Sequence, residues 1–232
     1  MKTVLNIFLA IAAVVLVVMC YQSLMIPIEF NAEVAKRDEV VIQQLKDIRT
    51  LQEEYQHKYG EYAPSWDKLI NFAKNDKIAL VKKVGNLTDD QLKEGLNEQT
   101  AWNYLKDPKK YAKEIAKFGL DINTFSRDSI YVTVIEKDSA LSRPGFDLDA
   151  IRFIPFAENP QDTVLLATGT QTSASGYVMP LFEAQMPFET YLYDLNEQEL
   201  NNKIQDRVQM DKFPGMMVGD ATVANNNAGN WE

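Results

Sequence analysis

The chain has 232 residues, 46% of them hydrophobic, and its 24 basic and 33 acidic side chains give a formal net charge of −9. This length suits one ordinary domain with its own hydrophobic core, and the acidic balance argues against nucleic acid and anionic lipid headgroups as partners. Cys20 is the single cysteine and His57 the single histidine. These counts exclude disulfides within the chain and any multi-histidine metal site.

The first predicted element is an apolar helix. Val4 to Met25 is a nearly unbroken apolar run. A helix of this length extends about 33 Å, enough to cross a hydrocarbon core of about 30 Å, so we predict a transmembrane anchor over residues 1–28. A cleaved signal peptide and a lipoprotein signal are the alternatives. The uncleaved anchor is favoured because no small-residue cleavage pattern follows the run and Met19, not a small residue, precedes Cys20.

The charges around the anchor predict its orientation. Lys2 precedes the run, and Glu29 and Glu33 follow it. The positive-inside rule then keeps the N-terminus in the cytoplasm and exports the remainder. Asn6 either hydrogen-bonds a neighbouring helix or lies at the membrane interface. Small residues that would permit close helix approach follow it: Ala10, Ala12 and Ala13.

The helical pattern continues beyond the anchor as a spine over residues 29–59. Its apolar face repeats at spacings of three, four or seven, through Val34, Val41, Leu45, Ile48, Gln52, Tyr55 and Tyr59. Pro27 is tolerable where the helix leaves lipid, and Gly60 is suited to end the helix. We therefore predict one long helix over residues 4–59, with a single face on which a domain packs.

Short elements follow the spine. The pattern predicts a helix capped by Ser65, a strand over residues 78–84, and a small helix opened by the capping box Thr88–Gln91. Asp107–Pro108 predicts the start of a further helix, which ends at Gly119.

The second half of the chain changes to a β pattern. Strands are predicted over residues 130–135, 150–156 and 164–170, and the loops between them favour antiparallel pairing. A polar helix follows over 195–210, and the Gly/Asn-rich tail 213–232 is predicted to be loop. The expected fold class is α+β: an N-terminal transmembrane helix continues into a long spine helix, with small helices and an antiparallel sheet packed on it. Residues 29–212 form the exported domain.

Two stretches resemble a known family. Ile42–Tyr55, followed by Lys58-Tyr-Gly-Glu-Tyr62 and Trp66-Asp-Lys-Leu69, is similar to the pattern of type II secretion pseudopilins, in which a spine helix ends in a tyrosine before an xxGxY turn and a short helix. Gly229-Asn-Trp-Glu232 resembles the Asn-Trp ending of major pseudopilins. The prepilin peptidase motif and the N-terminal glutamate of type IV pilin-like proteins are absent from the sequence. The resemblance implies a pilin-like membrane subunit, not an orthodox pilus building block.

For each candidate site residue, a structural interpretation is favoured over a functional one. The resemblance suggests calcium binding near the C-terminus, where Asp220 and Asn225, Asn226 and Asn227 offer oxygen ligands. A solvated tail is favoured, since only one carboxylate is present. Other candidates are the carboxylate pairs Asp147/Asp149 and Asp89/Asp90, and His57 near the end of the spine. Solvent contact and helix-dipole complementarity are favoured for these. We predict no catalytic, cofactor-binding or metal residue.

The aromatic stretch 177–193 bears on function. Its rings form either a partner-binding surface or, as favoured, a loop packed on the sheet: Tyr177, Phe182, Phe188, Tyr191 and Tyr193. The leading hypothesis is a non-enzymatic structural or assembly subunit of a cell-envelope machine, single-pass in the bacterial inner membrane with a periplasmic domain. Its expected partners are membrane lipid and other subunits, with no nucleic acid or small-molecule substrate. The alternatives are a membrane-tethered module that recruits a soluble periplasmic partner and an anchored hydrolase.

Overall fold

A computed structural model describes residues 2–232, except for the side chains of residues 2–5, 81, 82, 128 and 129. The chain forms two compact units, one from the residues up to Ala73 with Arg143–Glu232, the other from Lys74–Ser142. Helices and antiparallel strands make up both units. The predicted α+β class is confirmed.

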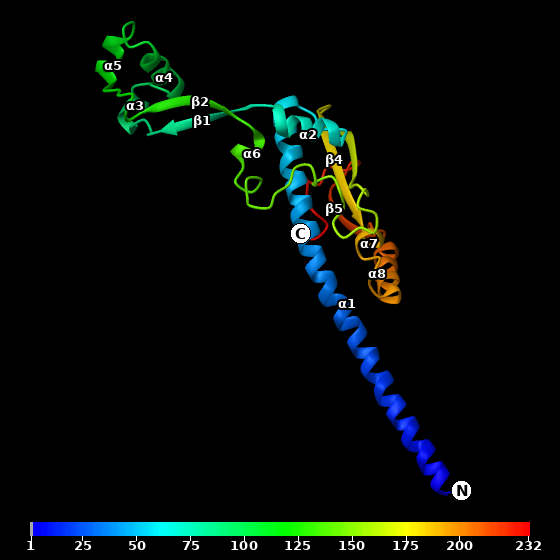
Figure 1. Ribbon diagram of the computed structural model, residues 1–232. Coiled ribbons are helices and arrows are strands. Elements are labelled where there is room, and N and C mark those ends of the chain that lie inside the picture. Colours follow the sequence, from blue (N-terminus) through cyan, green and yellow to red (C-terminus); the bar gives the residue numbers. More distant parts are fainter. Residues whose placement is uncertain (1) are drawn as a thin grey trace. The chain divides into compact units, whose positions relative to one another are not determined.

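The first unit is organised by α1 (Lys2–Tyr59), a single helix that runs through Pro27 without interruption (Figure 1). Gly60 ends it with a φ of +79°, which a residue without Cβ adopts without strain. The predicted helix over 4–59 is confirmed. The predicted face is buried from Val34 to Tyr55, but Tyr59 is 50% exposed. Tyr59 lies in the last turn, where its ring covers Tyr55 at a centroid distance of 4.6 Å.

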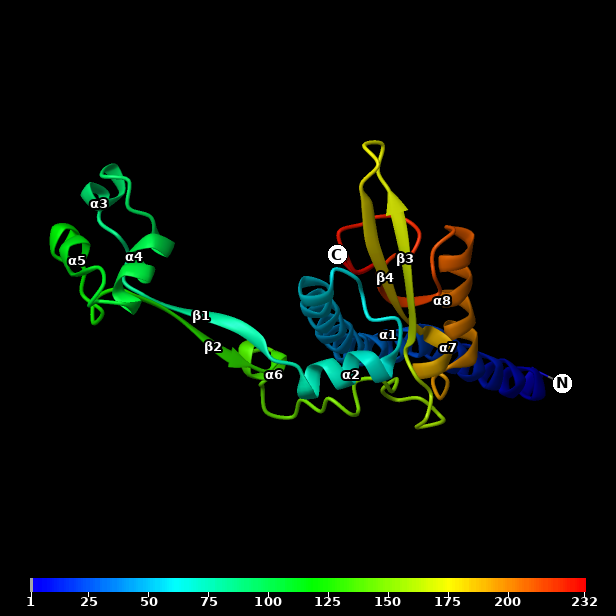
Figure 2. The ribbon, with the colours of Figure 1, turned by 90° about the horizontal axis from the view of Figure 1, so that it is seen from above.

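The sheet of the first unit packs on the spine half of α1. Its antiparallel strands are β3 (Leu165–Thr172), β4 (Val178–Pro187) and β5 (Gly215–Gly219), in the order β3-β4-β5. Alternate residues of β4, Phe182, Ala184 and Met186, are fully buried, as expected for a strand with one face on the core. Figure 2 shows the β3–β4 hairpin projecting beyond β5.

Three helices complete this unit: α2 (Trp66–Asn75), α7 (Phe188–Tyr191) and α8 (Glu197–Gln209). The predicted helices after Ser65 and over 195–210 are thereby confirmed. Asn196 caps α8, because its side chain accepts a hydrogen bond from the backbone N–H of Glu199 at 3.1 Å.

Three predictions for this unit are wrong. Residues 150–156 form turns with one bridge, Phe153 to Thr163, and the side chain of Gln44 satisfies two of their carbonyls. The stretch 177–193 contains β4 and α7 where a loop was predicted. The tail 213–232 contributes β5, which is only five residues long and bounded by glycines, so its sequence shows little alternation.

The second unit is a two-stranded β-ribbon, with one short helix after its second strand and three helices beyond its other end. β1 (Ile78–Val84) pairs with β2 (Ser126–Val132) along its whole length, and α6 (Val134–Lys137) follows β2. The helices α3 (Asp89–Lys93), α4 (Glu98–Lys106) and α5 (Ala112–Phe118) gather beyond the other end of the ribbon (Figure 1). They enclose a small core of Leu96, Ala101, Leu105, Leu120 and Phe125.

Capping decides the boundaries in the second unit. The Thr88–Gln91 capping box, the strand over 78–84 and the helix end at Gly119 are confirmed. The strand predicted over 130–135 is present but lies earlier, at Ser126–Val132, because Thr133 forms a capping box with Glu136 and so begins α6 after β2 has ended. The predicted start at Asp107–Pro108 is wrong. Asp107 is the C-cap of α4, which was not predicted.

A charged pair joins the ribbon to its helices. Arg127 is 7% exposed and donates to both carboxylate oxygens of Glu98, each at 3.0 Å. Its guanidinium also donates to the carbonyl oxygens of Val84, Gly85 and Ser126. Hydrogen bonding from Arg127 lowers the pKa of Glu98 to about 2.

We predict that the Arg127–Glu98 pair makes the second unit acid-sensitive. A carboxylate whose pKa is lower in the folded than in the unfolded protein stabilises the fold at pH values above its unfolded-state pKa. This stabilisation is lost as pH falls to the folded-state pKa. The stability difference between wild type and Glu98→Gln should therefore be present at pH 7 and shrink between pH about 4.5 and about 2. Urea unfolding followed by the Trp102 indole NMR signal measures it, and a difference that is constant with pH would contradict the assignment.

A second prediction concerns Gln52, which is fully buried. Its side-chain oxygen accepts a hydrogen bond from the N–H of Ala63 at 2.8 Å, and its side-chain nitrogen donates one to the Ala63 carbonyl at 3.0 Å. Gln52→Leu leaves the N–H and C=O of Ala63 buried without partners, at a cost of about 1–3 kcal/mol for each group. Chemical denaturation of the full-length chain in detergent should show this loss. The matched control is Gln56→Leu, one turn further along α1 and half-exposed. Equal effects of the two substitutions would contradict the prediction.

Candidate functional site

The first candidate is the exposed apolar half of α1. Its large side chains from Ile7 to Leu24 are between 49% and 68% exposed, and burial against the domain begins at Phe30. Among the described residues, α1 is the one helix long and apolar enough to cross a membrane. Figure 1 shows this half extending away from the sheet and from α7 and α8. It is a surface that requires an apolar environment, either lipid or neighbouring helices.

Just beyond this surface, a polar contact between Arg37 and Asp194, here called the lock, joins α1 to the α7–α8 connection. Arg37 is 9% exposed and donates to both carboxylate oxygens of Asp194, at 2.5 and 2.9 Å, and to the carbonyl of Tyr191 at 2.8 Å. Hydrogen bonding from Arg37 lowers the pKa of Asp194. A planar guanidinium bound in this bidentate way fixes orientation as well as distance.

A second polar contact lies next to the lock. The hydroxyl of Tyr191 donates to Asp38 at 2.7 Å, and Tyr191 is fully buried. Burial raises the pKa of the Asp38 carboxyl and of the Tyr191 hydroxyl, and it lowers the pKa of the neighbouring Lys203 ammonium. These groups fix α7 and α8 against α1.

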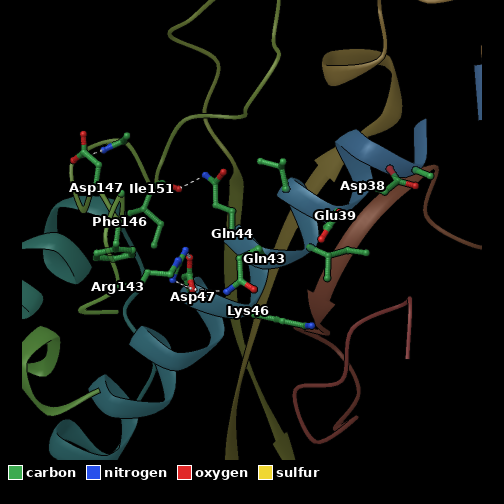
Figure 3. A pocket seen from close by; sticks show the side chains of 15 residues that line it. Asp38, Glu39, Gln43, Gln44, Lys46, Asp47, Arg143, Phe146, Asp147 and Ile151 are labelled. Atoms are coloured by element: carbon green, nitrogen blue, oxygen red, sulfur yellow. Dashed lines mark hydrogen bonds and ion pairs between the residues drawn. The ribbon is translucent and has the colours of Figure 1, made fainter. Parts of the chain in front are cut away.

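A groove runs beside the spine half of α1, between the helix and the segment 143–151. It has a volume of about 760 Å³. Figure 3 shows Arg143 turned toward Asp47, with distances of 2.5 and 2.9 Å between their donor and acceptor atoms. Gln43 also donates to Asp47 at 3.0 Å, and Gln44 reaches the carbonyl of Ile151 at 2.6 Å.

The polar groups of the groove are largely engaged in holding it together. Asp47 is 4% exposed and bonded to Arg143 and Gln43, so its oxygens are used within the wall. Asp147 accepts hydrogen bonds from the backbone N–H groups of Asp149 and Ala150. The groove therefore presents a mixed apolar and polar surface suited to contact with another molecule, without a nucleophile–base pair in its walls.

Three of the candidate ligands near the C-terminus form hydrogen bonds with other parts of the protein: Asp220, Asn225 and Asn227. Asp220 accepts from the backbone N–H groups of Thr222 and Val223 and from the Thr222 hydroxyl, which lowers the pKa of Asp220. The side chain of Asn227 donates to Glu53 and Tyr62. Asn225 donates to the carbonyl of Ala228. Among the described side chains, no cluster of three or more His, Cys, Asp or Glu is suited to hold a metal ion.

The Gly-Asn-Trp ending has a structural role that the sequence did not predict. Asn230 continues the pairing of β5: its side chain accepts from the N–H of Met217 at 3.2 Å and donates to the carbonyl of Gly215 at 2.9 Å. A Cβ at Gly229 would lie 2.3 Å from the Trp231 ring, so a larger residue there would require that ring to move. Glu232 pairs with Arg49 of α1 at 2.8 Å. The tail is thus tied to both the sheet and the spine.

The remaining candidate residues lie apart from one another along the chain. His57 occupies the last turn of α1, and Asp89 and Asp90 occupy the first turn of α3. The aromatic stretch divides: Phe182, Phe188 and Tyr191 are fully buried, which confirms core packing for them. The other two rings of the stretch are largely solvent-exposed: Tyr177 is 65% and Tyr193 45% exposed.

Comparison of the chain with protein-family models, curated proteins and solved structures gave no match.

The lock should be the most sensitive polar contact of the first unit. Arg37→Ala removes charge-assisted hydrogen bonds at a nearly buried position and should lower the free energy of unfolding by about 2 kcal/mol. Lys36→Ala is the matched control, because Lys36 is 74% exposed and forms an ion pair with Glu33 of its own helix. Such a surface pair contributes about 0–1 kcal/mol. Denaturant unfolding in detergent measures both variants, and an Arg37 effect no larger than that of Lys36 would contradict the lock.

Proposed function

We propose that this protein is a non-enzymatic, pilin-like structural or assembly subunit of a cell-envelope machine. Its N-terminal helix would span the bacterial inner membrane, with the N-terminus in the cytoplasm and the folded part in the periplasm. Its activity would be lateral association with other subunits, through anchor helices within the membrane and spine helices above it.

The observation that carries this proposal is the continuity of α1. One helix joins an exposed apolar half to a half buried under the domain. The anchor and the folded unit are therefore connected through one helix, which continues through Pro27 without a break. The lock at Arg37 supports the proposal, since it fixes α7 and α8 close to where the exposed half ends.

A second candidate function is a membrane-tethered binding module. The groove beside α1 favours it, because a concave and partly apolar groove with a volume of about 760 Å³ can accept a segment of a soluble partner. Binding of the partner through the aromatic stretch 177–193 is not favoured, since three of its five rings are fully buried.

Cysteine cross-linking within the membrane tests the leading proposal. Cys20 is replaced by alanine, and single cysteines are placed at Phe8, Ala12, Ala13 and Val17. An assembling subunit should give self-cross-linked species at positions on one helix face, because helices associate through a defined side.

The control for this experiment is Ala174→Cys in the exposed hairpin between β3 and β4. It should stay monomeric under the same oxidation. Monomers at every anchor position would reject the assembly function and favour the tethered binding module.

A further inference from the structure

The two units differ sharply in charge. Lys74–Ser142 contains 12 basic and 11 acidic side chains, a net charge of +1. The first unit contains 12 basic and 22 acidic side chains, a net charge of −10. The net negative charge of the chain, which argues against polyanions as partners, thus belongs to the first unit. The second unit is close to neutral.

Positive charge in the second unit is concentrated in one segment. Residues 106–117, here called the lysine segment, carry two acidic side chains and five lysines: Lys106, Lys109, Lys110, Lys113 and Lys117. All five lysines are exposed. Crowding five like charges into twelve residues costs stability, and a surface rich in carboxylates would relieve that repulsion.

The carboxylates of the second unit neutralise this segment only in part. Glu98 is engaged by Arg127, whereas Glu94 forms an ion pair with Lys117 at 3.5 Å. Hydrogen bonding with Tyr111 and the charge of Asp107 raise the pKa of Lys110. Among the ion pairs of the described residues, none includes Lys109 or Lys113. The segment therefore keeps positive charge available for a partner.

Aromatic rings lie beneath the lysines. The Lys106, Lys110 and Lys117 ammonium groups lie 5.6, 4.9 and 4.5 Å from the ring centroids of Trp102, Tyr111 and Phe118, respectively. These rings are half-buried. Cations above partly exposed rings combine long-range attraction with apolar contact area, a composition typical of protein-binding surfaces.

We propose that the lysine segment binds the acidic first unit of a second copy of this chain. Charge complementarity carries the inference, because the first unit has a net charge of −10 and the segment has five lysines against two carboxylates. The contact joins two different surfaces, so it is heterologous and can add copies repeatedly without closing. The inference rests on the proposed assembly function, which brings anchored copies together at high local concentration.

Zero-length carbodiimide cross-linking tests this contact, since it joins a lysine to a carboxylate only where the two touch. Full-length ¹⁴N- and ¹⁵N-labelled chains are mixed in phosphatidylcholine nanodiscs that hold several copies. Mass spectrometry should find mixed-isotope peptides linking the lysine segment to Asp or Glu of the first unit. Their yield should fall at least fivefold when salt is raised from about 0.05 to about 0.5 M, because exposed charges are then screened.

Charge reversal supplies the matched variants. Lys109→Glu should lower the mixed-isotope yield at least fivefold, and Lys109→Glu with Lys113→Glu should abolish it. Lys93→Glu makes the same change in net charge on α3, where Lys93 lies 3.8 Å from Asp90 of its own helix. It should leave the yield within twofold of wild type.

Three results would overturn the inference, in addition to the absence of these cross-links. The first is cross-links that join only peptides of the same isotope, which places the contact within one chain. The second is a yield that Lys109→Glu does not change. The third is competition by phosphatidylglycerol but not phosphatidylcholine vesicles, which makes anionic lipid the partner. Loss of these cross-links while anchor cysteines still cross-link would reject this contact alone, whereas loss of both would reject the assembly function.

Discussion

The structure depends on one constraint: α1 is a single helix with two incompatible solvent requirements. Its first half exposes large apolar side chains from Ile7 to Leu24, and its second half buries a stripe from Phe30 to Tyr55 under the sheet and small helices. At about 1.5–3 kcal/mol for each large side chain, leaving the first half in water costs on the order of 20 kcal/mol. The same free energy favours transfer of this half out of water, into lipid or against other helices.

Polar contacts determine how the rest of the first unit is oriented on that helix. Hydrophobic burial of the spine favours packing in general but is not directional, whereas the Arg37–Asp194 and Asp47–Arg143 pairs have fixed geometry. The tail adds a third attachment through Glu232 and Arg49. The second unit has its own small core and its own charged pair, so its charge and its binding surface are separable from those of the first.

Local signals in the sequence were sufficient for much of this fold. The length of α1, its apolar face and the capping box at Thr88 depend on neighbouring residues only, and all three were predictable. β5 was not, because five residues between glycines gain their strand character from pairing with β4. The lock was also beyond prediction, since Arg37 and Asp194 are 157 residues apart. Of the candidate site residues, Asp147, Asp220, Asn225 and Asn227 have hydrogen-bond partners within the fold, and the groove beside α1 was not foreseen.

Spin-label accessibility along α1 tests the central claim most directly. Labels are placed one at a time from residue 6 to residue 40 in the full-length chain in nanodiscs, and collisions with oxygen and with a water-soluble nickel complex are measured. The account predicts the highest oxygen accessibility near Leu16, a crossover to water near residue 30, and a helical periodicity that continues through Pro27. Water accessibility throughout residues 10–20, or a loss of periodicity at Pro27, would contradict a continuous helix that joins a membrane anchor to the folded unit.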